Sequence, residues 1–232
     1  MIDFHTHILP GMDDGSRDAA ESLEMLRRSQ AQGVGTVVLT PHFYAQRESI
    51  SSFCTRRQTA FAALREAQGG EPLPALALGA EVRYFEGMTR ADDLEKLCLG
   101  RYLLVEMPFD RWSGRTVKEV QNLPVSRGIT PILAHIERYF SLPHWEDAVE
   151  ELTAGGCLLQ MNAEAFRGLL RGRRARALLR QGWTNLLGSD CHNTTSRPPN
   201  LGEMRRELEA KIGGDIFQQI DRLGMQILRS AK

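Results

Sequence analysis

Short apolar runs alternate along this chain with longer stretches of amphipathic, helix-type pattern. An apolar run of four to eight residues is typical of a strand buried on both faces, and apolar residues three or four apart are typical of a helix. The runs that we expect to form strands are Ile2–His5, Val34–Thr40, Ala75–Glu81, Tyr102–Met107, Ile129–His135, Cys157–Asn162 and Thr184–Gly188. The helix-type segments between them include Ala19–Gln32, Ser52–Gln68, Val117–Arg127 and Ala163–Gln181.

This alternation predicts consecutive βα units, which build a parallel sheet with helical crossovers. Residues of the metal-binding type lie at or just after the C-terminal ends of six of the seven runs. A closed barrel brings these ends to one face, whereas an open sheet would spread them over about 30 Å. We therefore predict an α/β fold of one domain, residues 1–232, built as a small, distorted (β/α)7 TIM-like barrel.

The last part of the chain, Leu201 to Lys232, has a helical pattern that is interrupted at Gly213-Gly214. Asp215 follows the interruption, and aspartate is a favoured N-cap residue. We therefore expect two helices here, the second capped by Asp215.

The candidate metal ligands are His5, His7, Asp14, His42, Glu81, Glu106, His135, Asp190 and His192. His5-Thr6-His7 and Asp190-Cys191-His192 each place two of them at i and i+2, on the same side of an extended chain. Glu81 and Glu106 stand in apolar runs, where a carboxylate needs a metal or an arginine as partner. Asp14 lies in a glycine-rich turn, a common place for aspartate, and by itself carries no weight.

Nitrogen and oxygen ligands without an evident cysteine suit Mn²⁺, Fe, Zn²⁺ or Mg²⁺. Nine side chains are too many for one ion, so we predict two or three ions with a bridging carboxylate. The sixth histidine, His144, follows Pro143 away from any strand end, and we expect it on the surface or at a helix cap.

Composition narrows the choice of partners and of compartment. The formal net charge is zero, which gives no reason to expect nucleic acid or an anionic membrane as partner. No run of about 18 apolar residues occurs, and the N-terminus has no signal-peptide pattern. The cysteines, Cys54, Cys98, Cys157 and Cys191, show no C-x-x-C spacing. We expect no disulfide framework and a cytoplasmic protein; the sequence leaves the oligomeric state open.

Taken together, the motifs resemble the PHP (polymerase and histidinol phosphatase) family. More narrowly, they resemble the bacterial manganese-dependent protein-tyrosine phosphatases of capsule and exopolysaccharide operons. The matching motifs are His5–Gly15, Thr40-Pro41-His42, Gly79-Ala80-Glu81, Ala134–Tyr139 and Ser189–His192, in this order over nearly the whole chain. One departure is Ile136, where relatives commonly have proline; it removes no ligand.

The resemblance implies a distorted (β/α)7 barrel with three ions per chain, Mn²⁺ before Fe, Zn²⁺ or Mg²⁺. By position, the first ion would be held by His5, His7, Glu81 and Asp190. Glu81 would bridge to a second ion, held also by Glu106 and His135, and the third would be held by Asp14, His42 and His192. Other members of the family often have histidine at the position of Glu106.

The implied reaction is hydrolysis of phosphotyrosine by a metal-activated hydroxide. Our candidate catalytic residues are Arg138, Asp190 and His192. Arg138 lies three residues after His135 and is expected to bind the phosphate bidentately, with an ordinary surface ion pair as the alternative. Arg197 is a second candidate for this role. The implied partner is a phosphotyrosine protein, for example the tail of a bacterial tyrosine autokinase.

Three other functions compete with this interpretation. A small-molecule phosphatase, acting for example on histidinol phosphate, is disfavoured because the chain is short and lacks long insertions to close over its substrate. An amidohydrolase with a binuclear centre often has a carboxylated bridging lysine, and no lysine ends a predicted strand (Lys96, Lys118, Lys211 and Lys232). A non-catalytic, metal-stabilised regulatory domain is disfavoured by the complete ligand set.

Cys191 to Arg197 spells C-x5-R, the signature of cysteine-dependent tyrosine phosphatases. A phosphate cradle needs free backbone N–H groups that lead into a helix, but this segment runs into Pro198-Pro199. Cys191 is also expected to point away from Asp190 and His192. We therefore favour metal-dependent chemistry over a thiolate nucleophile.

Two further features have structural explanations that we prefer. Six arginines fall between Arg167 and Arg180, where we expect a solvated helix face. A dock for an acidic, phosphorylated tail is the alternative. Trp112, Trp145 and Trp183 are expected to serve packing.

Overall fold

The computed structural model describes residues 1–231 and has a mixed α/β fold with a curled parallel sheet. The strands are β1 Ile2–Thr6, β2 Thr36–Leu39, β3 His42–Phe43, β4 Ala75–Leu78, β5 Glu81–Arg83, β6 Tyr102–Glu106, β7 Thr130–Leu133, β8 Leu158–Asn162 and β9 Leu186–Gly188. The α-helices are α1 Ala19–Ala31, α2 Ile50–Gln68, α3 Gly114–Gln121, α4 Leu123–Arg127, α5 Trp145–Ala154, α6 Leu170–Arg180, α7 Leu201–Ile212 and α8 Asp215–Ser230. Short 3₁₀ segments are η1 Met88–Arg90, η2 Leu94–Leu97, η3 Ile136–Tyr139 and η4 Ala163–Phe166.

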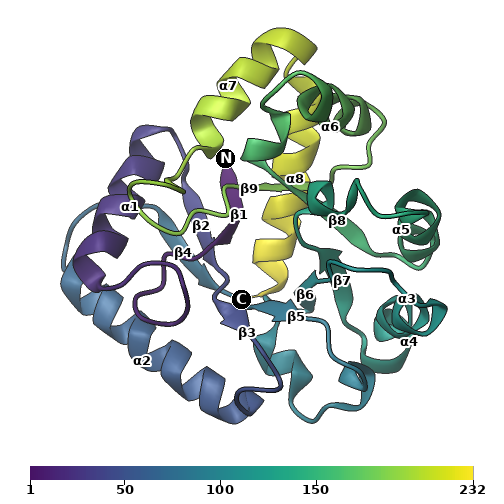
Figure 1. The fold of residues 1–232 in the computed structure, drawn as a ribbon. Helices are drawn as coiled ribbons and strands as arrows, with labels where there is room; N and C mark the ends of the chain where they lie inside the picture. Colours follow the sequence, from purple (N-terminus) through teal and green to yellow (C-terminus); the bar gives the residue numbers. More distant parts are fainter. Residues whose placement is uncertain (232) are drawn as a thin grey trace.

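Every pair of neighbouring named strands is parallel, as the βα alternation predicts. β1, β2 and β4 form one sheet in that order, and the order in the second sheet is β3-β5-β6-β7-β8-β9. A parallel bridge between Thr6 and Cys191 connects the end of β1 with the segment after β9. The Asp190 amide also donates to the His5 carbonyl at 2.8 Å. Helices α1 to α7 surround the curled sheet (Figure 1).

The prediction of seven strands differs from the structure in two places. The run Val34–Thr40 contains β2, and a separate short strand, β3, follows it. The run Ala75–Glu81 contains β4, and a separate short strand, β5, begins at its last residue. Pro41 lies between β2 and β3 and has no N–H group to donate to a neighbouring strand, so regular strand pairing is interrupted at this residue. The predicted count of seven βα units therefore stays a prediction.

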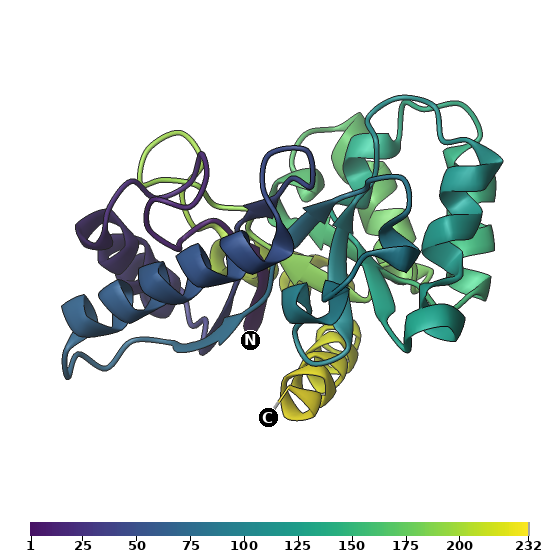
Figure 2. The ribbon, with the colours of Figure 1, turned by 90° about the horizontal axis from the view of Figure 1, so that it is seen from below.

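Two apolar clusters hold the fold together. The larger one contains the buried faces of the helices, and the smaller one contains Ile2, Phe4, Leu104 and Ile132 together with Ile227 of α8. Figure 2 shows α8 below the strands, on the side away from the loops that follow β1 and β9. α8 thus covers the N-terminal ends of the strands and leaves their C-terminal ends free for a site.

Several predicted helices have different limits. Val117–Arg127 is two helices, because Pro124 lies in the first turn of a new helix, α4, that begins at Leu123. Ala163–Gln181 is divided into η4 and α6, with Gly168 at a φ of +78° between them. The N-cap of α8 is Gly214 instead of Asp215. Asp215 is in the first turn, where a carboxylate interacts favourably with the helix dipole.

The predicted tail helix extends to Lys232, which lies outside the described residues. Within residues 1–231, none of the helices combines the length and apolarity needed to cross a membrane.

Candidate metal centre

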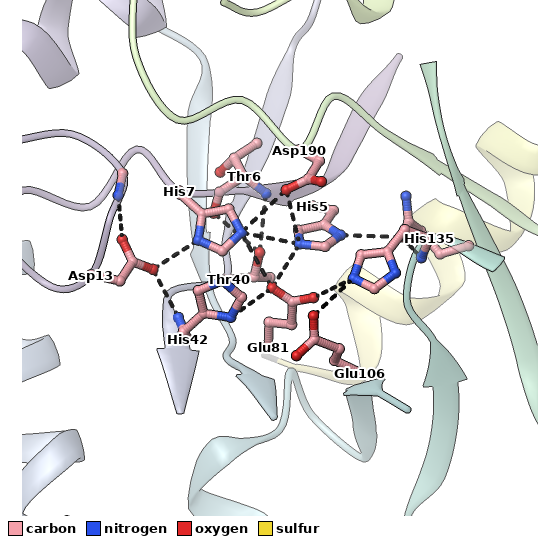
Figure 3. Close-up of polar contacts among 12 residues, drawn as sticks. His5, Thr6, His7, Asp13, Thr40, His42, Glu81, Glu106, His135 and Asp190 are labelled. Carbon is pink, nitrogen blue, oxygen red and sulfur yellow. Dashed lines mark hydrogen bonds and ion pairs between the residues drawn. The ribbon is translucent and has the colours of Figure 1, made fainter. Parts of the chain in front are cut away.

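The predicted ligands meet at one end of the curled sheet. Figure 3 labels all of them except Asp14 and His192. His5 is in β1, His42 begins β3, Glu81 begins β5 and Glu106 ends β6. The other predicted ligands lie in the segments that follow β1, β7 and β9: His7, Asp14, His135, Asp190 and His192. Most of them are buried, but Asp14 has a side chain that is 68% exposed and stands at the open edge of the site.

Three groups of these residues have ligand atoms that all lie within 4.8 Å of one another. The groups are His5, His7 and Glu81; Glu81, Glu106 and His135; and His7, Asp14, His42 and His192. Glu81 joins the first group to the second, and His7 joins the first to the third. Asp190 lies beside the first group, with Oδ1 at 3.6 Å from His5 Nε2 and 3.4 Å from His7 Nε2.

Glu81 is at the centre of the cluster formed by the predicted ligands. Its Oε2 atom lies 3.1 Å from His5 Nε2 and 3.0 Å from His42 Nδ1, and its Oε1 atom lies 2.9 Å from His135 Nε2. Burial disfavours the carboxylate, but the surrounding histidines reverse this effect and lower the pKa of Glu81 well below its usual value. A carboxylate in this position can bridge two cations.

Within residues 1–231, four buried atoms of the predicted ligands form no hydrogen bond: Glu81 Oε2, His42 Nδ1, His135 Nδ1 and His192 Nε2. Glu81 Oε2 and His42 Nδ1 lie 3.0 Å apart, but without hydrogen-bond geometry. Buried polar atoms are nearly always hydrogen-bonded, so four unpartnered atoms in one place need an explanation. Metal ions bound among imidazole nitrogens and carboxylate oxygens would satisfy Glu81 Oε2, His42 Nδ1 and His192 Nε2. The residues present therefore fit the metal centre that the sequence predicts.

Glu106 has the arginine partner expected for a buried carboxylate and also contacts a predicted metal ligand. Arg83 Nη1 donates to Glu106 Oε2 at 2.9 Å, and Glu106 Oε1 lies 3.4 Å from His135 Nε2. Burial lowers the pKa of His135, but the contacts of this histidine with Glu106 and Glu81 outweigh burial and raise the pKa to about 9. Glu106 therefore contacts the cluster through one oxygen while Arg83 holds the other.

Asp13, which the sequence analysis did not select, contacts two of the histidine segments. Its Oδ2 atom accepts hydrogen bonds from His7 Nδ1 at 2.7 Å and from the His42 amide at 2.8 Å, and its Oδ1 atom accepts one from the Gly15 amide. A carboxylate on Nδ1 directs Nε2 of His7 toward the centre. Nothing in the sequence distinguishes Asp13 from Asp14 for this role.

Gln160 and Asn162 of β8 form a second set of supporting contacts. Gln160 Oε1 accepts a hydrogen bond from the His135 amide at 2.7 Å and lies 3.1 Å from His5 Nδ1. Gln160 Nε2 donates to Asn162 Oδ1, and Asn162 Nδ2 donates to Asp190 Oδ2, both at 2.8 Å. Polar residues at i and i+2 in an otherwise apolar strand are a sequence signal that could have identified this pair.

His135 and Asp190 both have left-handed backbone conformations, with φ values of +35° and +54°. This conformation is uncommon for residues other than glycine, and such strained residues cluster at functional sites. In each case the chain turns sharply as it leaves a strand, which directs the side chain into the cluster.

The two candidate arginines both reach Asp190. Arg138 Nη2 lies 2.5 Å from Asp190 Oδ2, and Arg197 Nη2 lies 2.8 Å from the same oxygen. Both arginines line a cavity of about 750 Å³ that has Asp190 at its inner end. The side chains are 34% and 39% exposed, so their remaining N–H groups can reach a bound anion.

The other residues considered from the sequence lie apart from this chemistry. Cys191 is fully buried, and burial raises the pKa of its thiol far above the usual value, so it is no nucleophile. His144 is on the surface, 3.3 Å from Asp147, at the start of α5. The three tryptophans pack in or against the larger core cluster, which confirms their predicted role.

The chain matches the family described as "Capsular polysaccharide synthesis, CpsB/CapC" over residues 1–228. Tyrosine-protein phosphatase CpsB from Streptococcus pneumoniae is 32% identical over 232 residues, which cover 92% of this chain and 91% of that protein. Tyrosine-protein phosphatase YwqE from Bacillus subtilis (strain 168) is 28% identical over 241 residues, which cover 99% of this chain and 92% of that protein.

The fold is similar to that of solved proteins. One match is to a crystal structure from a study of YwqE from Bacillus subtilis and CpsB from Streptococcus pneumoniae, described as metal-dependent tyrosine phosphatases. It has a TM-score of 0.81 at 25% identity and covers 100% of this chain and 96% of that one. Histidinol phosphate phosphatase from Lactococcus lactis shares the fold, with a TM-score of 0.58 at 12% identity over 91% of this chain and 93% of that one. The chain therefore belongs to the CpsB/CapC family of capsular polysaccharide synthesis.

Proposed function

We propose that this protein is a metal-dependent protein-tyrosine phosphatase, a phosphoric monoester hydrolase. The observation that carries the proposal is the set of three overlapping ligand groups that share Glu81 and His7. The names of the relatives from Streptococcus pneumoniae and Bacillus subtilis support the same activity. The proposed substrate is a phosphotyrosine protein, with the tail of a bacterial tyrosine autokinase in capsule regulation as its first candidate.

The proposed cofactor is three ions per chain, Mn²⁺ first and Fe, Zn²⁺ or Mg²⁺ as alternatives. His5, His7, Glu81 and Asp190 would hold the first ion; Glu81, Glu106 and His135 the second; and Asp14, His42 and His192 the third. His7 is also near enough to the third group to be shared. Bound ions would supply Lewis-acid charge and an activated water.

The protein supplies binding and orientation around this centre. Arg138 and Arg197 would bind the phosphate oxygens with paired N–H groups, in the geometry that guanidinium groups favour for phosphate. Their common contact with Asp190 keeps both beside the ligand cluster. Asp13 and Gln160 hold the imidazole rings in place. The leaving group is a phenolate with a parent pKa near 10, so it needs less proton donation than a serine alkoxide.

We also propose that residues 1–232 form one domain with a distorted (β/α)7 barrel. Two contacts support closure of the curled sheet: the Thr6–Cys191 bridge, and the hydrogen bond from the His7 amide to the Cys191 carbonyl at 2.9 Å. Counting β2 with β3 and β4 with β5 then leaves seven strands within the described residues. The cytoplasmic location stays a prediction from the sequence.

The decisive experiment combines metal analysis with activity. Purified protein is assayed on para-nitrophenyl phosphate, a phosphotyrosine peptide and histidinol phosphate, before and after chelation and after Mn²⁺ is restored. We expect bound metal, loss of activity on chelation, recovery with Mn²⁺ and preference for the phosphopeptide. Preference for histidinol phosphate would favour a small-molecule phosphatase. Metal-loaded protein without phosphatase activity would favour a non-catalytic domain.

A further inference from the structure

A basic groove leads away from the metal centre between α1, α6 and α7. It is the outer part of the cavity of about 750 Å³ that reaches Asp190. In Figure 1, α7 lies between α1 and α6, and all three helices contribute to the walls. The arginines that line the cavity are Arg28, Arg138, Arg167, Arg171, Arg197 and Arg206. The cavity has the size of a ligand pocket, larger than one phosphate group needs.

Four of these arginines already have a carboxylate partner. Arg28 pairs with Glu24 at 2.8 Å and Arg167 with Glu164 at 3.0 Å, while Arg138 and Arg197 share Asp190. These pairs neutralise much of the charge that the four arginines bring to the groove.

Arg171 and Arg206 differ from the other four. Arg171 Nη2 donates to the Glu137 carbonyl oxygen at 3.4 Å, and Arg206 Nη1 donates to the Gln32 carbonyl oxygen at 3.0 Å. Within residues 1–231, neither forms an ion pair with a carboxylate, although Glu203 lines the same cavity one turn before Arg206 on α7. A backbone carbonyl orients a guanidinium group without cancelling its charge, so both arginines keep free N–H donors for an external anion.

We propose that this groove binds a second anionic group of the substrate peptide, a few residues from the phosphotyrosine that is hydrolysed. The proposal rests on the proposed phosphatase function, because Arg138 and Arg197 then hold the first phosphate. Arg171 on α6 and Arg206 on α7 bind the second anion. That anion is either another phosphotyrosine or an aspartate or glutamate side chain, since both present oxygens to a guanidinium group.

The test compares three peptides that carry the same phosphotyrosine. One has neutral flanks, one has acidic flanks, and one has a non-hydrolysable phosphonate in place of a second phosphotyrosine. We expect the wild-type protein to prefer at least one anionic peptide over the neutral one by about tenfold in kcat/KM, from two contacts of ordinary surface strength. Which anionic peptide is preferred identifies the source of the second anion.

The Arg171→Gln/Arg206→Gln double variant should lose this preference and keep its rate on para-nitrophenyl phosphate. The matched control is Arg173→Gln/Lys211→Gln, which removes exposed charges from the same two helices outside the cavity. The proposal is overturned if the wild-type protein does not distinguish the peptides, or if the first double variant keeps the preference.

Binding of fully non-hydrolysable phosphonate versions of the peptides separates this proposal from the phosphatase function. A binding preference for the anionic peptides that depends on Arg171 and Arg206 supports the groove even where no turnover is found. Turnover without any such preference overturns the groove and leaves the phosphatase function in place. Added salt should weaken the preference, because the contacts are exposed to solvent.

A separate observation concerns Phe109, in the loop after β6. Its side chain is 44% exposed, although its ring stacks on that of His135 with centroids 5.9 Å apart and an interplanar angle of 27°. The guanidinium carbons of Arg83 and Arg138 lie 5.1 and 5.9 Å from the centre of the Phe109 ring. An exposed aromatic ring therefore stands at the metal centre, beside the arginine proposed to bind phosphate.

We further propose that Phe109 contacts the tyrosyl ring of the substrate and favours aryl over alkyl phosphates. This also rests on the phosphatase function. An aromatic pair contributes about 0.5–1.5 kcal/mol beyond the area that it buries, which corresponds to about a 2- to 12-fold effect. Phe109→Ala should raise KM for a phosphotyrosine peptide by a factor in this range and leave kcat nearly unchanged.

The same variant should leave kcat/KM unchanged on a phosphoserine peptide, where no ring is present. Leu169→Ala is the matched control, because Leu169 is 90% exposed and lies outside the ligand cluster. Phe109→Leu should fall between wild type and Phe109→Ala. Equal losses on both peptides, or no change on either, would overturn the role of Phe109. A wild-type protein inactive on both peptides would instead contradict the phosphatase function.

Discussion

Replacing Asp13 tests whether the orientation of His7 controls metal binding. Asp13 is not one of the predicted metal ligands, but its carboxylate accepts hydrogen bonds from His7 Nδ1, the His42 amide and the Gly15 amide. Burial raises the pKa of Asp13, but His7 reverses this effect and the net pKa lies far below its usual value, so the group accepts all three bonds as an anion. Removal of such a partner typically weakens metal affinity 10- to 100-fold.

Asp13→Asn and Asp13→Ala should weaken Mn²⁺ binding to different extents. In Asp13→Asn, the amide oxygen can take the place of Oδ2 and accept the hydrogen bonds from His7 and His42. The amide NH2 group then faces the Gly15 N–H group, so that hydrogen bond is lost. We expect about a 10-fold loss of Mn²⁺ affinity for Asp13→Asn and about 100-fold for Asp13→Ala, or about 1.4 and 2.7 kcal/mol. Saturating Mn²⁺ should restore most of the activity, because the nine predicted ligands are unchanged.

The measurement is a Mn²⁺ titration of chelated protein, followed by calorimetry and by activity on para-nitrophenyl phosphate. Asp147→Asn is the matched control, since Asp147 faces His144 at 3.3 Å on the surface with both side chains at least 80% exposed. The reasoning would be refuted by Asp13→Ala protein that binds Mn²⁺ as tightly as wild type, or by activity that saturating Mn²⁺ does not restore.

Three other changes have expected outcomes. Glu81→Gln should reduce both metal content and activity more than Glu106→Gln, because Glu81 belongs to two ligand groups and Glu106 to one; elemental analysis and turnover measure this. Cys191→Ala should keep activity within a few-fold of wild type while chelation abolishes it, and the opposite pattern would restore the cysteine mechanism. Gly224→Ala should lower the melting temperature without changing metal affinity, because a Cβ there would lie 2.7 Å from Phe4 Cε2 in the smaller apolar cluster, between α8 and the strands; unchanged stability would contradict that packing.

The parallel strands and the position of most candidate ligands could be predicted because each rests on a local rule. Apolar runs at regular spacing identify the strands, and a histidine or carboxylate near the end of such a run is costly unless it has a partner. His5, His7, Glu81 and His135 were identified in this way. The i, i+2 pair Asp190 and His192 followed from the same alternation of side chains.

The polar i, i+2 pair in β8 marks Gln160 and Asn162 in the sequence, but the contacts of the supporting residues could not be predicted, because they join distant segments. Asp13 and Asp14 are neighbours in one loop, but Asp13 is buried against His7 while Asp14 is largely exposed. Gln160 serves His5 and His135, which lie 155 and 25 residues away along the chain. A propensity or a periodic pattern carries no information about such pairings.

The two interruptions that the strand prediction missed are themselves part of how the site is built. β3 and β5 are the short strands that follow the breaks at Pro41 and at Gly79-Ala80, and their register places His42 directly opposite Glu81. A similar irregularity occurs in β1, where three residue steps from Asp3 to Thr6 match two steps from Val37 to Leu39. A β-bulge of this kind re-aims the side chains that follow it. The regular pattern that makes the sheet predictable therefore ends where the side chains have to turn toward a common centre. Departures from strand periodicity beside ligand-type residues are for this reason evidence for the site.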